Sequence, residues 1–534
     1  QVNQDKTFSN QSRLPKLPVP TLEETTTKYL HSLRPLLSDK DFAKNEAHIK
    51  DFLKPNGLGR ILQQRLIDID RISPNNWLDD TWWIKKAYQE WRVSLVINSN
   101  WFFLFFNDSN TPREYFSIDN GVKPRGHFSE FQLAYSPHPN SVKYILIIVK
   151  NQFYILDGYD KSGIRLTAGD IEKQLNDIIA DVKKAQIDPP VGILTADDRD
   201  SWTMSRERLL AISPQNRETL TFIENSLFAV NLDDYATGTD LDKFLGNIFH
   251  GFDGHNRWFD KEMSIIVDSN GRAGMNGEHS PCDALIPAFA SEWILKEPTS
   301  LNAQLSGRPI PPPFRIRFIT NEQTLKDIRA AESRTRDLIA DSDATLAYYQ
   351  LHGRVVPTYE TGATRKFLRG RTETVRTLSV ESKAFVEGML DKSLSVQQKY
   401  DRLQAATKAH TNYSIDASNG KGCDRHLLGL RLLLQKGESH PIFEEPIFAK
   451  SQEWLLSTSS LTSGDYFSGT GFGCVYPNGY GINYSPGEHI MKFGIESKFS
   501  SSETDTKALK ESIIKALRDM RNICEQVNGK PSKL

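Results

Sequence analysis

The sequence has few cysteines and almost no net charge. Its 534 residues include only Cys282, Cys423, Cys474 and Cys524, which lie far apart and form no Cys-x-x-Cys pair. This spacing disfavours a zinc site and a disulfide framework, and it favours a reducing compartment. The formal net charge is -1, whereas a general nucleic-acid binder usually carries a basic excess. We therefore expect neither a metal nor a nucleic-acid partner.

Long hydrophobic runs are also missing, and no uninterrupted apolar stretch is long enough to span a membrane. The most apolar short run covers residues 101–106. A buried strand is the favoured interpretation of this run, and a membrane-docking patch is the alternative. Apolar content of 38% and charged content of 25% are ordinary for a soluble globular protein. The length predicts two or more domains.

The first candidate site is a histidine with a carboxylate four residues later, His279 and Asp283. Such a carboxylate can hold the imidazole in one tautomer while the other ring nitrogen takes a proton. On its own the pair is weak evidence, since most such pairs lie on a solvated helix face. The apolar run 263–267, the turn Asp268-Ser269-Asn270-Gly271 and a second short strand predict a hairpin that delivers His279. A base at the end of a hairpin is held rigidly, as proton transfer requires.

The hydrophobic periodicity predicts a mixture of strands and helices. Proline at residues 311–313 marks a crossing between two domains, which we place at 1–313 and 314–534. Strands are expected at 144–149, 153–156, 191–195 and 314–318, and helices at 21–37, 168–185, 284–295, 324–339 and 505–527.

The residues around His279 resemble the active-site signature of the carnitine/choline acyltransferase family. The signature combines Arg257-Trp258-Phe259-Asp260-Lys261, the turn, and Glu278-His279 followed by Asp283. The resemblance implies an α/β, two-domain CoA-dependent acyltransferase fold, with similar mixed sheets in both domains and an active-site tunnel at their interface. Further motifs follow in the family's order: Asp198-Arg199-Asp200-Ser201-Trp202, which we interpret as structural, Tyr359-Glu360-Thr361, Gly370-Arg371-Thr372-Glu373-Thr374, Asp424-Arg425-His426-Leu427, Ser457-Thr458-Ser459 and Gly471-Phe472-Gly473.

The resemblance also implies roles for individual residues. His279 would act as general base and acid, with Asp283 as its orienting group and Ser459 as oxyanion donor. Ser460 would lie beside CoA, although most relatives have another polar residue there. The carnitine-binding residues would be Tyr359, Thr361, Thr372, Arg425 and Phe472, with Arg425 paired to the carboxylate and Phe472 near the trimethylammonium. Without the family, a solvated strand is the default interpretation of the segment from Tyr359 to Thr374, and a serine-rich loop is the favoured one around Ser459. A structural salt bridge is the alternative for Arg425.

The implied reaction is reversible transfer of a short acyl group between CoA and the hydroxyl of carnitine. Choline has no carboxylate and would gain nothing from Arg371, Thr372 and Arg425, so these residues favour carnitine. Acetyl is the favoured group, because the glycine-rich run near Thr470 is most like that of fungal carnitine O-acetyltransferases. Small residues at this position could instead leave the tunnel open, so a medium- or long-chain enzyme is one alternative. A degenerate family member that binds without turnover is the other.

Two segments are shorter than the family pattern. The region 98–137 lacks the family's Asn-Gln-Tyr motif, and the lysine-rich segment that would meet the CoA phosphates is missing near residues 341–344. We expect CoA or acyl-CoA as co-substrate, no permanently bound cofactor, and a monomer. The terminal Ser532-Lys533-Leu534 predicts a peroxisomal location. A mitochondrial location is also expected if an N-terminal presequence has been removed.

Overall fold

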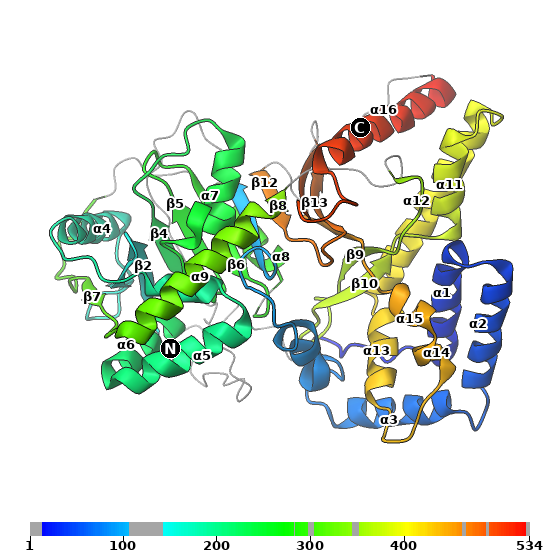
Figure 1. Ribbon diagram of the computed structural model, residues 1–534, viewed down its shortest axis with the longest axis horizontal. Coiled ribbons are helices and arrows are strands. Elements are labelled where there is room, and N and C mark those ends of the chain that lie inside the picture. Colours follow the sequence, from blue (N-terminus) through cyan, green and yellow to red (C-terminus); the bar gives the residue numbers. More distant parts are fainter. Residues whose placement is uncertain are drawn as a thin grey trace.

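The computed structural model describes residues 13–105, 142–281, 283–296, 304–343, 352–461, 466–486 and 491–529. Cys282, Ala344, Ser532-Lys533-Leu534 and most of the region 98–137 lie outside these ranges. Two lobes, each built around a mixed sheet, lie side by side (Figure 1). The expected α/β fold with two mixed sheets is confirmed.

The first sheet has eight strands in the order β12-β1-β6-β5-β4-β2-β3-β7. Its central strands β2, β4 and β5 run parallel, and every other neighbouring pair is antiparallel. The predicted hairpins β2–β3 and β5–β6 are both present. The strands are β1 (Asn100–Phe105), β2 (Tyr144–Val149), β3 (Gln152–Asp157), β4 (Ala229–Leu232), β5 (Ser264–Val267), β6 (Ala273–Glu278), β7 (Phe314–Ile316) and β12 (Phe467–Phe472).

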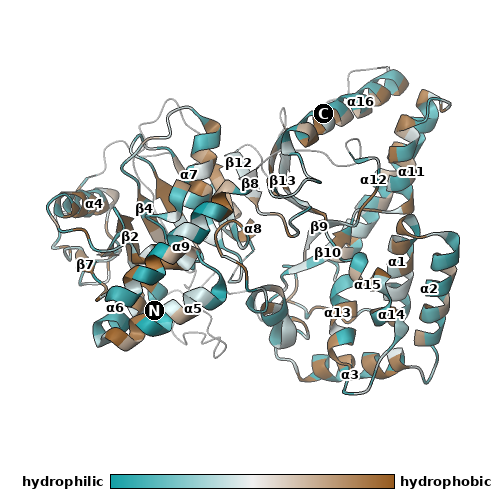
Figure 2. Cartoon of the chain, viewed as in Figure 1, coloured by the Kyte–Doolittle hydropathy of each residue, from teal (hydrophilic) through white to brown (hydrophobic). Residues whose placement is uncertain are grey.

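Apolar side chains on both faces explain why this sheet is covered on both sides. In β2, Leu146 and Ile148 enter one core, whereas Ile147 and Val149 enter a second core on the other face. A strand buried on both faces needs such a continuous apolar run. Figure 2 shows apolar residues concentrated in the strands of this lobe. The helices of this lobe include α4 (Ala168–Val182), α5 (Arg199–Ile212), α6 (Pro214–Asn225), α7 (Leu241–Gly254), α8 (Leu285–Lys296) and α9 (Glu322–Ala340).

The second sheet has six strands in the order β10-β9-β11-β13-β14-β8. Here β9, β11 and β13 run parallel and the outer pairs are antiparallel. The strands are β8 (Ser342–Asp343), β9 (Thr358–Ala363), β10 (Thr372–Arg376), β11 (Leu456–Ser460), β13 (Tyr480–Pro486) and β14 (Met491–Lys498). Helices α11 (Val380–Leu390), α12 (Val396–Ser418) and α16 (Thr506–Asn528) lie in this lobe, with α12 in contact with β9, β10 and α16.

The packing crosses residue 313 in both directions. β7 pairs with β3, and α9 packs against α7, so both extend the first lobe past that residue. Conversely, the N-terminal helices share one core with helices of the second lobe. These helices are α1 (Leu22–Leu33), α2 (Asp39–Phe52) and α3 (Leu58–Ile72) on one side, and α13 (Asp424–Leu432), α14 (Pro441–Glu444) and α15 (Pro446–Lys450) on the other. The division into 1–313 and 314–534 stays a prediction.

Some local predictions need correction. Residues 191–195 are not a strand but part of a buried 3-10 helix, η6 (Val191–Ala196). A side chain at Gly192 would collide with the carbonyl oxygen of Arg257. The backbone at Gly192 therefore packs directly against the backbone at Arg257, and it does not join a sheet. The first helix ends at Leu33, and Arg34–Leu36 form a short 3-10 helix with Pro35 as its second residue.

The apolar run that begins at Trp101 forms β1, and its described residues are all buried. The strand interpretation of this run is therefore confirmed for residues 101–105. Among the described residues, every helix is too short or too polar to cross a membrane.

Candidate active site

His279 is the first residue after β6, and its side chain is 36% exposed. Its Nδ1 lies 3.2 Å from the hydroxyl of Tyr88 and 3.6 Å from Oδ1 of Asp283. Among the described residues, Nε2 has no hydrogen-bond partner. The imidazole is thus held from its Nδ1 side, and Nε2 is left for a reactant.

The end of β6 is fixed by the buried carboxylate of Glu278. This carboxylate accepts hydrogen bonds from Ser99 (2.6 Å), Arg199 (2.9 Å) and the amide of Ser280 (2.9 Å). Arg199 comes from the motif that we interpreted as structural. These bonds fix the backbone on both sides of His279, so the position from which its imidazole projects is fixed as well.

Arg371, just before β10, connects the second sheet to the His279 loop. Its guanidinium forms two 3.0 Å bonds to the carboxylate of Asp283. It also donates to the carbonyl oxygens of His279 (3.0 Å) and Ser280 (2.9 Å) and to the hydroxyl of Tyr88 (3.1 Å). Its charge is therefore matched within the protein, which corrects the expectation that it serves the substrate's carboxylate.

The same contacts change the expected role of Asp283. Its bidentate partner is Arg371, whereas His279 Nδ1 at 3.6 Å is beyond hydrogen-bond distance. Burial alone would raise the pKa of this carboxyl group, but Arg371 and His279 outweigh burial and hold the pKa below its usual value. Asp283 is therefore a carboxylate at neutral pH, and it places negative charge near the imidazole.

Four of the hydroxyl-bearing candidates share one face of the second sheet. Cross-strand register pairs Thr361 with Thr374 and Tyr359 with Ser457. Because side chains alternate along a strand, this face carries the set Tyr359, Thr361, Thr372, Thr374, Ser457 and Ser459. Ser460 lies on the opposite face, and its amide donates to the carboxylate of Glu360 at 3.1 Å.

Arg425, on the first turn of α13, lies against this hydroxyl face. Its guanidinium donates to the carbonyl oxygen of Thr372 (3.2 Å), to Thr372 Oγ1 (3.4 Å) and to Thr374 Oγ1 (3.1 Å). The guanidinium also lies 4.0 Å from the ring centre of Trp83. Within the described part of the chain, no carboxylate lies at ion-pair distance from it. A half-buried cation with neutral partners suits an anionic ligand.

Phe472 is the last residue of β12, which belongs to the C-terminal half of the chain but pairs with β1. It stands opposite Trp101. Two glycines allow β12 to lie directly on the second sheet, since a side chain at Gly481 would contact the carbonyl of Phe472 at 2.8 Å and one at Gly494 would collide with that of Thr470. The strand therefore joins the two sheets.

The sequence did not reveal Tyr88 as a site residue. It lies on the single-turn π-helix η5 (Lys85–Gln89), and its side chain is buried. Its hydroxyl contacts both His279 and Arg371. π-turns occur often at functional sites, but nothing in a short aromatic run distinguishes one from an ordinary helix.

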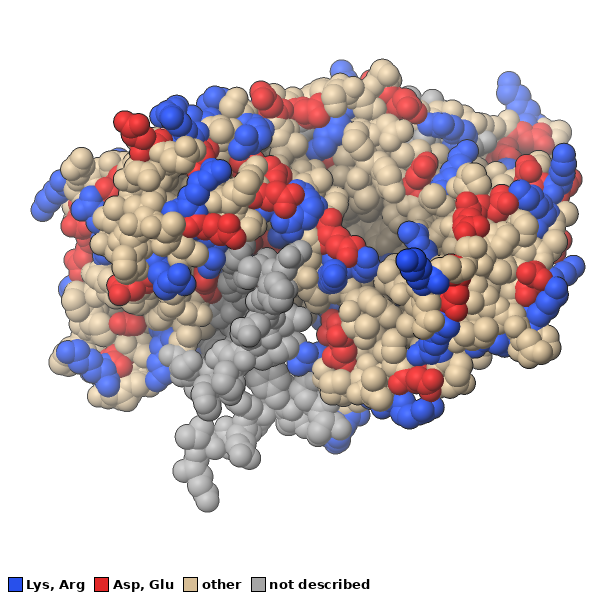
Figure 3. Space-filling model, turned by 60° about the horizontal axis from the view of Figure 1, so that its bottom comes forward, with Lys and Arg blue, Asp and Glu red and all other residues tan. Residues whose placement is uncertain are grey.

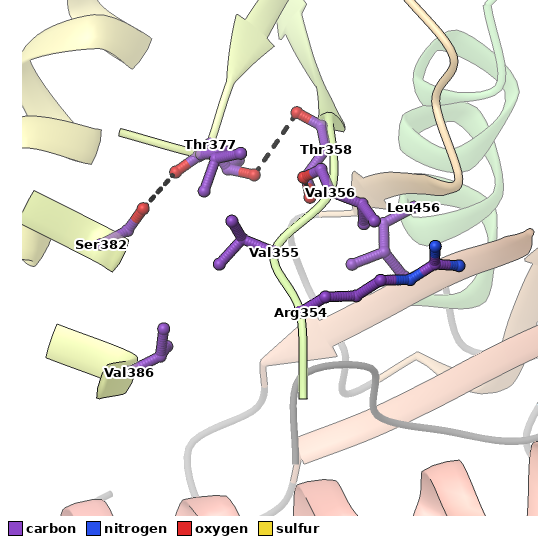
Figure 4. A pocket seen from close by; sticks show the side chains of 9 residues that line it. Arg354, Val355, Val356, Thr358, Thr377, Ser382, Val386 and Leu456 are labelled. Atoms are coloured by element: carbon purple, nitrogen blue, oxygen red, sulfur yellow. Dashed lines mark hydrogen bonds between the residues drawn. The ribbon is translucent and has the colours of Figure 1, made fainter. Parts of the chain in front are cut away.

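The surface is hollowed near the middle of the molecule, and side chains of both charges lie around the hollow (Figure 3). A pocket of about 180 Å³ lies where β9 and β11 begin (Figure 4). Its walls are mainly apolar and include Val355, Val386 and Leu456. None of the predicted site residues lines it.

Comparison with known proteins identifies the family. The model of the Choline/Carnitine o-acyltransferase family matches residues 17–126, 124–346 and 344–515. Choline O-acetyltransferase of Mus musculus is 29% identical over 614 aligned positions, covering 97% of this chain and 94% of the relative. Carnitine O-acetyltransferase is 29% identical in Mus musculus and 30% identical in Homo sapiens, each over 600 positions with the same coverage.

The alignments exceed the 534 residues of this chain, so the relatives hold segments that it lacks. The matched segments of the family model meet at 124–126 and at 344–346. These are the two places where the sequence is shorter than the family pattern. The chain therefore belongs to the choline/carnitine O-acyltransferase family, as an acyltransferase acting between CoA and carnitine or choline.

Proposed function

We propose that the protein transfers an acetyl group reversibly between CoA and the hydroxyl of carnitine. The observation that carries the choice of carnitine is Arg425. Its guanidinium faces the hydroxyls of Thr372 and Thr374 and has no carboxylate partner among the described residues. Carnitine brings a carboxylate to such a cation, whereas choline would leave the charge unmatched.

His279 is the proposed base, and its tautomer decides whether it can act. Nε2 can accept a proton only if Nδ1 carries the hydrogen, so an acceptor must face Nδ1. The oxygen of Tyr88 lies 3.2 Å away, and the carboxylate of Asp283 lies slightly farther off. The negative charge of Asp283 then stabilises the imidazolium that forms.

In the forward direction, Nε2 of His279 takes the proton from the carnitine hydroxyl while that oxygen attacks the thioester carbonyl carbon of acetyl-CoA. Ser459, from β11, is the proposed donor to the resulting oxyanion. The carbon–sulfur bond then breaks, and Nε2 returns the proton to the CoA sulfur. In the reverse direction, His279 deprotonates the CoA thiol.

A short acyl group is supported by the packing around Thr470. Gly469 and Gly471 on either side of Thr470 have no side chains, but side chains of β1 fill the space next to them. A side chain at Gly471 would lie 2.6 Å from the ring of Phe102, and one at Gly469 would lie 3.1 Å from Leu104. The three relatives named above are all acetyltransferases by name.

Release of the CoA thiol from acetyl-CoA, measured with carnitine, with choline and with neither, tests this proposal. We expect release with carnitine, and Arg425→Asn should raise KM for carnitine by about tenfold or more through loss of the charged contact. Equal or faster release with choline would establish the choline enzyme instead. Carnitine binding without thiol release would establish a degenerate member, and faster release from longer acyl-CoA a long-chain enzyme.

A further inference from the structure

Glu373 is a buried carboxyl group on the far side of β10 from the hydroxyls of Thr372 and Thr374. Only 4% of the residue is exposed. Its Oε1 accepts hydrogen bonds from the amide of Thr374 (2.7 Å) and from the amide of Arg425 (3.3 Å). One side chain thus ties the strand that carries the hydroxyls to the helix that carries the guanidinium.

The start of α13 is built around this carboxyl group. The residue before the helix is Cys423, whose side chain caps no amide. Free amides at a helix start need acceptors, and a negative charge is favourable there. Gly422 closes over the group, since a side chain at that position would collide with the carboxyl of Glu373. Glu373 therefore supplies from a neighbouring strand the acceptor that the helix lacks.

Charged and titratable groups surround Glu373 on each element packed against it. α13 contributes Arg425 and Asp424, and Asp424 is itself paired at 2.7 Å with Arg376, which lies on the opposite face of β10. Cys423 precedes α13, and Tyr413 of α12 lies 3.3 Å from the Cys423 sulfur. Burial raises the pKa of Glu373 to about 7, Arg425 opposes this rise, and Asp424 adds to it.

We propose that Glu373 is a positioning residue for the carboxylate of the acyl acceptor: it fixes Arg425 against Thr372 and Thr374, and its own charge sets how strongly that acceptor binds. This inference rests on the proposed use of carnitine. When Glu373 is ionised, its negative charge offsets part of the positive charge of Arg425. When Glu373 is protonated, Arg425 attracts the carboxylate of the acceptor more strongly.

The sign of the effect follows from these charges. As pH rises through the pKa of Glu373, the group becomes negative and affinity for carnitine falls. The wild-type enzyme should therefore show KM for carnitine rising by about three- to tenfold between pH 6 and pH 8.5. KM for acetyl-CoA should not rise with pH in this way, because Arg425 would bind the carboxylate of carnitine.

The experiment compares wild type, Glu373→Gln, Glu373→Asp and the exposed control Glu511→Gln over this pH range, with KM for both substrates, kcat, and the Kd of carnitine by calorimetry. Glu373→Gln keeps an acceptor oxygen but no charge, so its KM and Kd for carnitine should stay low and independent of pH. Glu373→Asp withdraws the oxygen from the Arg425 amide and should raise KM for carnitine at every pH. Glu511→Gln should match wild type.

The same rise with pH in Glu373→Gln as in wild type overturns the inference, as does a wild-type KM for carnitine that is flat while turnover is normal. The pH dependence of the wild-type KM for carnitine provides this test even if a variant does not fold. If wild type releases no thiol with carnitine and does not bind it, the proposed function fails and the inference fails with it. A change in kcat alone, with KM for carnitine unaffected, assigns Glu373 to another step and also overturns the inference.

Discussion

Tyr88 contributes the hydroxyl nearest to His279 Nδ1, and Arg371 donates to the same oxygen. Burial raises the pKa of this phenol, so it is protonated at neutral pH. Tyr88→Phe removes the acceptor that favours hydrogen on Nδ1, and we expect kcat to fall by about ten- to a hundredfold with little change in melting temperature. Tyr400→Phe, on α12, is the matched control, and an unchanged kcat in Tyr88→Phe would contradict the role.

His279→Ala should abolish thiol release altogether, because no other described group lies at Nε2 to take the proton. Circular dichroism should show an intact fold, since the ring is 36% exposed and contributes little to a core. Full activity in this variant would show that the base lies elsewhere.

The sequence predicted which residue types gather at the site better than it predicted their partners. The motifs brought His279, Asp283, Thr372 and Arg425 into one list, and Arg371 and Tyr88 connect them in the structure. The pairing of Arg371 with Asp283 could not be foreseen, because it joins groups far apart in the chain. The placement of Ser460 opposite Ser459 follows from strand alternation, but only once β11 is known to be a strand.

At the level of secondary-structure elements, β12 is the strand on which the arrangement of the two sheets depends. It pairs with β1 and lies on β13 and β14 where Gly481 and Gly494 leave room. Gly494→Ala would force a methyl group into the carbonyl oxygen of Thr470, so we expect the free energy of unfolding to fall by about 2 kcal/mol. The expected shift of β12 should also lower acyl-transfer activity.

Gly246→Ala in α7 is the control for this change. A methyl group there would meet ring atoms of His250 and Phe252 at 3.4 Å, an ordinary contact distance, and alanine favours a helix by about 1 kcal/mol over glycine. Chemical denaturation of both variants compares the two effects. Equal stability of Gly494→Ala and wild type would contradict the tight contact.

Elements with local signals were predicted well, and elements defined by long-range contacts were not. The hairpin β2–β3 and the helix α16, with its Asp505 cap, follow from apolar periodicity and turn residues. The strand prediction for residues 191–195 is wrong because a short apolar run does not distinguish a strand from a 3-10 helix such as η6. The insertion of β12 beside β1 has no local signal at all.

For the molecule as a whole, two buried histidines link stability to pH. Burial lowers the pKa of His250 to about 4, with a smaller contribution from Arg257, and lowers that of His426 to about 3. In the unfolded chain both titrate near pH 6.5. Below that pH the unfolded state binds more protons than the folded state, so stability is full above pH 6.5 and is lost as pH falls.

We expect the free energy of unfolding to drop by about 2 kcal/mol between pH 6 and pH 5 from these two residues. Urea denaturation at several pH values measures the slope, and His250→Gln should make it about half as steep over this interval. A stability that stays constant down to pH 5 would contradict the buried, neutral state of both rings.

The pairing of β1 with β12 has a consequence for how the protein is made. A chain emerging from the ribosome completes β1 and β6 long before β12 has been translated, so one edge of the large sheet stays unpaired during most of synthesis. Open strand edges invite pairing with other chains. Nascent copies released early, or truncated before Phe467, should accordingly need a chaperone to stay out of aggregates.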